Sequence, residues 1–415
     1  MSRRELGASS VTSSRRSGAM KWMSYPLLLA LIGCIWGTTT SGLISSNDGS
    51  HLALTRSLAL RHQPTLEEEA PLTLRVDLAR RAGRLYSDRP PGTALLAIPA
   101  VWLGAKFDGA LAVASQRERR VLQPPAGPDF SHTYRVRAPN GRHLLALQGS
   151  AIAATVHVGV LGLLTLVLLA WRLRSAAVRE RNIAFCLLSL GLGSLLGPYA
   201  ITMFGHVPAA FAVSLLYWSA DRLRNAESEA AAALWRPGLA LGVAGGLCVT
   251  TDYLLFVPVA ALMLTRLRRE TLAPVIVGSM VFGGAAAIYH TVAFGAPWAI
   301  GYDFHTNFEF ARSRSTTFDG DIVEGVAALF GFDEGGVGRM SPLWYLGLIA
   351  FFWAPASADQ RWRHWVERAG WLVWMCALAR HQTPMGGAFH DHRYLIPLLP
   401  VLAYDLGRLM EEVKG

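Results

Sequence analysis

The sequence predicts an all-α polytopic membrane protein, a chain whose helices cross a bilayer many times. Of its 415 residues, 52% are hydrophobic and only 16% are charged, whereas about 25% of the residues of a typical globular domain are charged. The apolar residues form long runs, and several runs reach the roughly 18 to 20 residues that a helix needs to cross a bilayer. The clearest run is LLALQGSAIAATVHVGVLGLLTLVLLAW, residues 144–171.

The formal net charge of +10 does not indicate a nucleic-acid partner. The arginines form short clusters between apolar runs, which is the pattern that the positive-inside rule produces in membrane proteins. The four cysteines all lie within apolar runs and form no C-x-x-C pair, so the sequence contains neither a disulfide framework nor a zinc motif.

The basic, serine-rich residues 1–22 are expected to be a disordered cytoplasmic tail, and residues 23–415 to form a single transmembrane domain. The first apolar segment is expected to be an uncleaved signal anchor that runs outward. Two long external loops follow at 45–143 and 293–340, and the C-terminus returns to the cytoplasm. The predicted spans, ten in all, are 24–44, 144–171, 183–203, 205–220, 236–250, 253–265, 272–292, 341–356, 369–385 and 394–408.

The segment 92–114 has two possible placements, across the bilayer or along its outer surface. If it crossed, every later basic cluster, from Arg172 to Arg408, would lie outside, against the positive-inside rule. If it lies in the interface, only the basic segment 115–143 remains outside. The second placement breaks the rule once, so 92–114 is expected to be a juxtamembrane helix.

Charged and imidazole side chains recur where the predicted spans reach the outer face. Each of these residues, taken alone, is most simply a solvated loop residue or a helix cap. We interpret Asp303 and His305 in this way. Together they point to a shared site, because charged groups at membrane depth usually face an aqueous cavity and mark function. The residues are Asp48, His51, Asp77, Asp88, Arg89, His206, Asp252, Tyr253, His390, Asp391, His392 and Arg393.

Arg89 stands before two prolines that favour the start of a helix, in GRLYSDRPPGTALLAIP, residues 83–99. An arginine at a helix N-terminus suits an anionic ligand such as a phosphate. Contact with lipid headgroups is an equally good interpretation from physics alone.

Several motifs, taken in order, resemble those of the GT-C glycosyltransferases. After the early acid come YSDRPPGTALLAIP, FGH, GVAGGLCVTTDYLLFVPVAAL, FGAPWAIGYD, MSPLW and HRYLIPLLP. The resemblance covers residues 24 to 408. It is greatest to the bacterial branch, family 39-like, that is related to the protein O-mannosyltransferases and the lipid A aminoarabinose transferase.

The resemblance implies a GT-C-type fold and an inverting hexosyl or pentosyl transferase. Such an enzyme moves a sugar from a polyprenyl-phosphate donor to an acceptor at the outer, periplasmic face of a bacterial inner membrane. By position Asp48 is the general base and Arg89 binds the donor phosphate, with Arg393 and His392 as further phosphate-binding candidates. Asp88, His51, His206, Asp252 and Tyr253 are expected to line the substrate cavity. No cofactor or metal is predicted, because the sequence has no DxD motif and no His-His-acid cluster.

A transporter or flippase of lipid-linked sugars is the alternative, because it would use a similar amphipathic cavity. It should place charged residues at mid-membrane and on the inner side as well, whereas the sequence suggests charges at the outer face only. The identity of the sugar stays open, as does that of the acceptor, which could be a glycan, a lipid or a protein.

Overall fold

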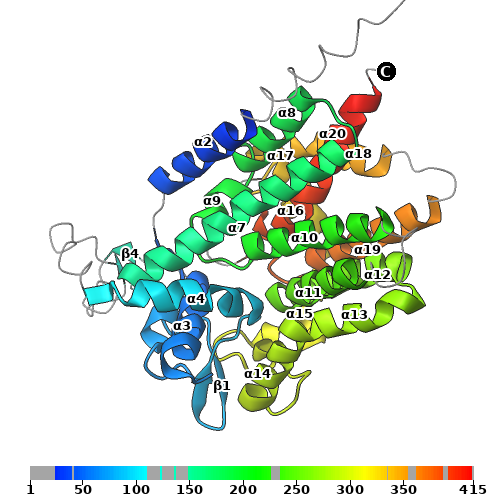
Figure 1. Cartoon of the computed structure of the whole chain (residues 1–415). Coiled ribbons are helices and arrows are strands. Elements are labelled where there is room, and N and C mark those ends of the chain that lie inside the picture. The colour runs from blue at the N-terminus through cyan, green and yellow to red at the C-terminus, as the bar shows by residue number, and fades with distance from the viewer. Residues whose placement is uncertain are drawn as a thin grey trace, which may run out of the picture.

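The computed structural model describes residues 24–39, 42–109, 122–123, 135–136, 148–225, 234–333, 335–353, 361–386 and 391–413. The predicted tail 1–22 and most of the basic segment 115–143 lie outside these residues, as does His390. Within them the chain is a bundle of helices, with a smaller group of elements at one end (Figure 1).

Each predicted apolar segment contains a helix. These helices are α2 (Ser24–Thr39), α7 (Gln148–Ser175), α8 (Glu180–Gly191) with α9 (Leu196–Ala200), α10 (His206–Asn225), α11 (Trp235–Thr251), α12 (Phe256–Arg266), α13 (Arg269–Ser279) with α14 (Ala285–Phe294), α18 (Trp344–Trp353), α19 (Arg361–Ala379) and α20 (Leu399–Glu412). By length and composition, two stretches of the described chain are long and apolar enough to cross a membrane, Gly149–Ser175 and Arg269–Phe294. The helical class is confirmed, and the number of ten crossings stays a prediction.

The outside of the bundle is apolar, as expected for helices in contact with lipid. Leu27 is 72% exposed, Leu264 75% and Ile288 69%, and contiguous exposed apolar surface on this scale is rare in soluble monomers. Trp371 and Trp374 are buried between helices.

Glycines allow two central helices to approach closely. A Cβ added at Gly242 of α11 would collide with the backbone of Val275 in α13, and one at Gly278 would collide with that of Leu239. The second helix continues through a π-helical turn, Met280–Gly284, into α14. These contacts fix the side of the bundle that supports the candidate site.

The group of elements at the end away from the C-terminus is built mainly from the first of the two predicted external loops (Figure 1). The first loop contains α3 (Ser46–Arg61), η1 (Ala70–Thr73), the antiparallel hairpin β1 (Ala79–Arg81) and β2 (Arg84–Tyr86), and α4 (Gly92–Ala105). The second contains η6 (Gly301–Phe304), η7 (Glu309–Arg312), α15 (Arg314–Thr317), α16 (Ile322–Phe330) and α17 (Val337–Met340). Short 3₁₀ segments η4 (Tyr253–Leu255) and η9 (Arg393–Leu398) lead into α12 and α20. Helix α3 was not predicted, because most of its side chains are buried against other loop elements and it has no amphipathic pattern.

Helix α4 falls within the predicted juxtamembrane segment. It packs on α3 and α7, while Trp102 and Leu103 are 51% and 54% exposed. The ammonium of Lys106 lies 3.8 Å from the centre of the Trp102 ring. An exposed tryptophan beside a lysine is typical of the membrane interface, so the interfacial placement stays a prediction that this surface supports.

The opposite end of the bundle contains a buried ionic network that sequence reasoning missed. Its ion pairs are Arg172–Asp221 at 2.8 Å, Arg266–Glu367 at 2.8 Å and Arg368–Asp405 at 2.7 Å. Asp221 lies fifteen residues along α10 from His206, roughly 22 Å away. The expectation that charged groups gather at one face only is therefore wrong. Paired charges escaped notice because each partner comes from a different helix.

Candidate functional site

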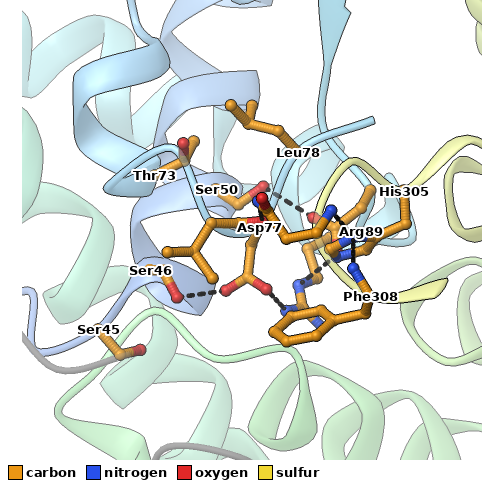
Figure 2. A network of polar contacts seen from close by, with 12 residues as sticks. Ser45, Ser46, Ser50, Thr73, Asp77, Leu78, Arg89, His305 and Phe308 are labelled. Carbon is orange, nitrogen blue, oxygen red and sulfur yellow. Dashed lines mark hydrogen bonds and ion pairs between the residues drawn. The ribbon is translucent and has the colours of Figure 1, made fainter. Parts of the chain in front are cut away.

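A buried polar cluster joins three segments of the first loop. Arg89 forms ion pairs with Asp77 and with Asp88, the latter at 3.3 Å from Nε to Oδ2. The first two turns of α3 contribute Ser46, whose hydroxyl donates to Asp77 at 2.5 Å, and Ser50, whose hydroxyl donates to Asp88 at 3.3 Å (Figure 2). Ser46 and Ser50 share one face of α3 because they are four residues apart.

His305 joins this cluster from the second loop. Its Nδ1 accepts hydrogen bonds from the backbone N–H groups of Asn307 and Phe308, each at 3.0 Å. The proton of the neutral ring is therefore on Nε2, which lies 3.4 Å from Oδ2 of Asp88. His305, left among solvated residues from sequence, is 2% exposed and faces a buried acid.

Asp77, Asp88 and His305 place their ligand atoms within 4.8 Å of one another, as a metal site would. Two features disfavour a metal there. The guanidinium of Arg89 already supplies the positive charge between the two acids. In addition, a histidine that binds a metal through Nε2 needs its proton on Nδ1, and Nδ1 of His305 is an acceptor here. The group fits a cation-paired cluster better than a metal centre.

Arg89 is fixed in front of helix α4. Pro91 is the N-cap of that helix, and a Cβ added at Gly92 would lie 2.6 Å from the carbonyl of Thr250. The start of α4 is therefore pressed against the end of α11. The side chain of Arg89 is 16% exposed, and the charges of Asp77 and Asp88 outweigh burial, so its pKa is raised.

Arg393 is the second buried arginine of the site. Its Nη1 lies 3.2 Å from Oδ1 of Asp391, whose Oδ2 accepts a 2.6 Å hydrogen bond from the hydroxyl of Tyr199. The guanidinium also lies 5.1 Å from the ring of Tyr394. The ring of His206 packs at 5.2 Å against the same tyrosine.

Ring contacts lead from one arginine group to the other. The guanidinium of Arg393 lies 5.9 Å from the centre of the Phe204 ring, and that ring stacks on His206 at 6.2 Å. A Cβ added at Gly205 would lie 3.4 Å from Nε2 of His51. Five of the residues expected at the site, from four separate segments, are thus brought together: His51, Asp88, Arg89, His206 and Arg393.

The remaining expected residues lie at the border of this group. Asp252 caps η4 by accepting the N–H of Leu254 at 3.0 Å. The Tyr253 hydroxyl is 2.9 Å from Nε2 of His290, and Asp252 is within electrostatic range of Tyr302. His392 is fully buried, and its Nδ1 is hydrogen-bonded to the carbonyl of Gly335 at 2.9 Å. This hydrogen bond has a structural role.

Asp48 has a local role that the sequence did not reveal. Its Oδ1 accepts hydrogen bonds from the N–H of Ser45 at 2.8 Å, the hydroxyl of Ser45 at 2.9 Å and the N–H of Gly49 at 3.1 Å. Its Oδ2 accepts the N–H of Ile44 at 2.8 Å. Asp48 therefore caps the N-terminus of α3 in a capping box with Ser45. Burial outweighs these bonds and raises the pKa of Asp48 to about 6.

The other two titratable groups near α3, His51 and Asp88, both have lowered pKa values. Burial, with the charge of Arg89, lowers the pKa of His51 to about 3, so the imidazole is neutral at physiological pH. Burial acts to raise the pKa of Asp88, but Arg89 and His305 outweigh it and the pKa falls to about 2. Asp88 is thus a permanent anion beside Arg89. Nδ1 of His51 is buried without a hydrogen-bond partner among the described residues.

Sequence reasoning missed several members of the site. Tyr199, Tyr302 and Tyr394 surround the two arginines, and His305 faces Asp88. A tyrosine in or beside an apolar helix is common, so nothing in its sequence context marks it. Only the HRY motif, which contains Tyr394, carried a signal.

Comparison with known proteins supports the fold. No family model and no curated protein matches the sequence. Two crystal structures of ArnT from Cupriavidus metallidurans match over 94% of this chain with 15% sequence identity. The TM-score is 0.53 for the apo state and 0.55 for the state bound to undecaprenyl phosphate.

The chain spans 59% to 60% of the length of those ArnT chains. A likeness at this identity concerns the arrangement of the helices and extends over nearly the whole chain described here. The arrangement of helices expected from the sequence motifs is confirmed: the chain has the fold of these ArnT structures.

Proposed function

We propose that this protein is an inverting glycosyltransferase that uses a polyprenyl-phosphate sugar as donor. The sugar, a hexose or a pentose, passes to an acceptor at the outer face of a bacterial inner membrane, and both termini lie in the cytoplasm. The observation that carries the proposal is the chain of contacts between the Arg393 and Arg89 groups, in which Tyr394 beside Arg393 packs on His206 and Gly205 lies against His51. Undecaprenyl phosphate is the ligand in one of the ArnT structures with the same fold.

The arginines suit the leaving group of this reaction. A phosphate monoester leaves as an anion, and its charge must be stabilised more than it must be protonated. Arg89 has five N–H donors and is oriented by Asp77 and Asp88, so it is preorganised before the substrate arrives. Preorganised cations in a site shielded from water are usually the largest catalytic contribution. His51 stays neutral and adds no competing charge.

Asp48 is proposed as the general base. The acceptor hydroxyl oxygen attacks the anomeric carbon and the bond from that carbon to the phosphate oxygen breaks. The hydroxyl proton passes to the carboxylate of Asp48, and the electron pair of the broken bond stays on the phosphate. One carboxylate is sufficient, because inversion requires no covalent intermediate. A pKa near 6 suits a base that works near neutral pH.

A second function, transport of a lipid-linked sugar, is favoured by one observation, the buried ionic network at the other end of the bundle. In that network each arginine is matched by an acid, and complete pairing is typical of a structural role. We therefore keep the transferase as the proposed function.

The test is chemical. Surface lipids, glycans and glycoproteins of the host are compared by mass spectrometry with and without the gene, and after complementation. Wild-type protein should restore one sugar modification, and Arg89→Met should not. Arg80→Ala, which removes an exposed arginine from the nearby hairpin, is the matched control and should restore it. If Arg89→Met restores the modification fully, the phosphate-binding role is excluded.

A direct assay separates the two functions. Purified protein in detergent, where no gradient or second compartment exists, should release free polyprenyl phosphate from its donor in the presence of an acceptor extract. A transporter would release none, because transport leaves the sugar bond intact.

A further inference from the structure

A pocket lies between the β1–β2 hairpin and the end of α14. Its volume is about 470 Å³, within the range of small-ligand sites. One wall is basic and polar, and the other is the apolar end of α14. The lining residues that matter here are Arg81, Arg84, Tyr86, Val292 and Ala293.

Arg81 is held in place by aromatic and backbone contacts, with no carboxylate partner among the residues that the structure describes. Its guanidinium lies 5.9 Å from the centre of the Phe304 ring, and Phe304 stacks on Phe294 at 5.2 Å. On its other side the guanidinium contacts Gly295, whose φ of +81° and lack of Cβ leave room for it. A cation–π contact positions the charge and leaves its N–H groups available for an anion.

Arg84 is exposed on the second strand of the hairpin. In the described part of the chain neither Arg81 nor Arg84 forms an ion pair. The charge of Arg84 affects a nearby acid, Glu67. Burial acts to raise the pKa of Glu67, but hydrogen bonds and the charge of Arg84 lower it. Glu67 accepts the backbone N–H of Leu85 at 3.2 Å. The pocket thus contains two cations and no paired anion.

The apolar wall of the pocket belongs to a helix that is a candidate membrane span. It is the end of the stretch Arg269–Phe294, which is long enough to cross a membrane. Ile288 and Val292 are 69% and 60% exposed on successive turns of α14, and Trp298, just beyond the helix, is 79% exposed. Exposed tryptophan marks the headgroup region of membrane proteins. The arginines therefore lie beside an exposed apolar surface with a tryptophan at its end, a pattern typical of the headgroup region.

We propose that this pocket binds the phosphate of an anionic lipid, with Arg81 and Arg84 on the phosphate and the acyl chains along Ile288 and Val292. The planar fork of arginine matches phosphate oxygens in pairs. The exposed apolar ridge that leads into the pocket favours a lipid over free phosphate, because a free ion would gain nothing from it. None of the residues that line this pocket is assigned to the donor site, so the proposal does not depend on the proposed function.

The test is native mass spectrometry of the detergent-solubilised full chain titrated with phosphatidylglycerol. Wild-type protein should retain the lipid, and Arg81→Ala/Arg84→Ala should lower its affinity by about tenfold or more, the loss typical of charged hydrogen bonds. Arg80→Ala is the matched control, since it removes the same charge from the same hairpin at a residue that does not line the pocket. Its affinity should stay within about twofold of wild type, because its charge is screened by solvent. Thermal unfolding of each variant checks that the hairpin is intact.

Three results would overturn the proposal. The double variant could retain the lipid as well as wild type does. Arg80→Ala could weaken binding as much as the double variant, which would mean a diffuse charge effect. Millimolar inorganic phosphate could displace the lipid completely, which would make the site one for a free anion. Loss of sugar transfer with intact lipid binding would contradict only the function proposed above.

Discussion

Replacing Asp48 with asparagine separates its two roles, helix cap and general base. The amide keeps an oxygen for the three donors that reach Oδ1, from Ser45 and Gly49. Its NH₂ group then faces the N–H of Ile44, so one buried hydrogen bond at 2.8 Å is lost. Loss of one such bond costs about 1–3 kcal/mol of unfolding free energy. Loss of the base should reduce sugar transfer by about 10²- to 10⁴-fold.

Ser45→Ala is the matched control for the capping role. It removes the hydroxyl that donates to Asp48 at 2.9 Å and should cost about 1 kcal/mol, as typical caps do. It leaves the carboxylate in place, so most of the transfer activity should remain.

The pH profile gives an independent readout. With a pKa of about 6 for Asp48, transfer should rise roughly tenfold per pH unit below pH 6 and level off above it. The Ser45 hydroxyl lowers this pKa, so Ser45→Ala should move the rise to higher pH. The raised pKa also has a stability consequence: the folded protein binds the proton more tightly, so the contribution of Asp48 is fully present below pH 3.8 and is lost as the pH rises through about 6.

The assay is release of polyprenyl phosphate per folded molecule, with unfolding followed by heat in the same detergent. The base assignment is refuted if Asp48→Asn and Ser45→Ala lose activity in proportion to their loss of stability. It is also refuted if Asp48→Asn keeps the wild-type rise near pH 6.

Three further changes test other parts of the structure. Arg89→Met should abolish transfer and destabilise the fold by about 3–5 kcal/mol, because Asp77 and Asp88 lose their buried cation. Adding Asp77→Asn to this variant should recover stability in thermal unfolding, but it should not recover transfer. Asp405→Asn should also destabilise the fold by about 3–5 kcal/mol, since Arg368 loses its partner. Transfer per folded molecule should be unchanged. A loss of transfer beyond the loss of folded protein would link the ionic network at the far end to catalysis. Gly242→Ala should lower the melting temperature, because its Cβ would collide with the Val275 backbone. Gly283→Ala is the control, because its Cβ would meet nothing within 4 Å and should leave the melting temperature unchanged. Equal effects of the two substitutions would contradict the close packing of α11 and α13.

The elements that sequence reasoning found were those with a strong local signal. The apolar runs predicted the helices, because about 20 apolar residues in a row have few alternatives to a buried or membrane helix. The RPP motif predicted both the start of α4 and the place of Arg89. Helix α3 was missed because its buried face contacts several loop elements and includes serine, histidine and arginine, so it has no hydrophobic periodicity.

The sequence by itself determined the helical class, the order of the helices and the segments that carry the charged residues, because these depend on composition and on neighbouring residues. Only the tertiary structure decided which charges meet. It paired Asp77 with Arg89, turned His305 toward Asp88 and directed Asp48 to the backbone of its own helix. Such contacts join residues as distant in the sequence as Asp88 and His305, or depend on which side of a helix faces the core. Electrostatic interactions act over distance in space and not over distance along the chain, so they become definite only when the helices are packed.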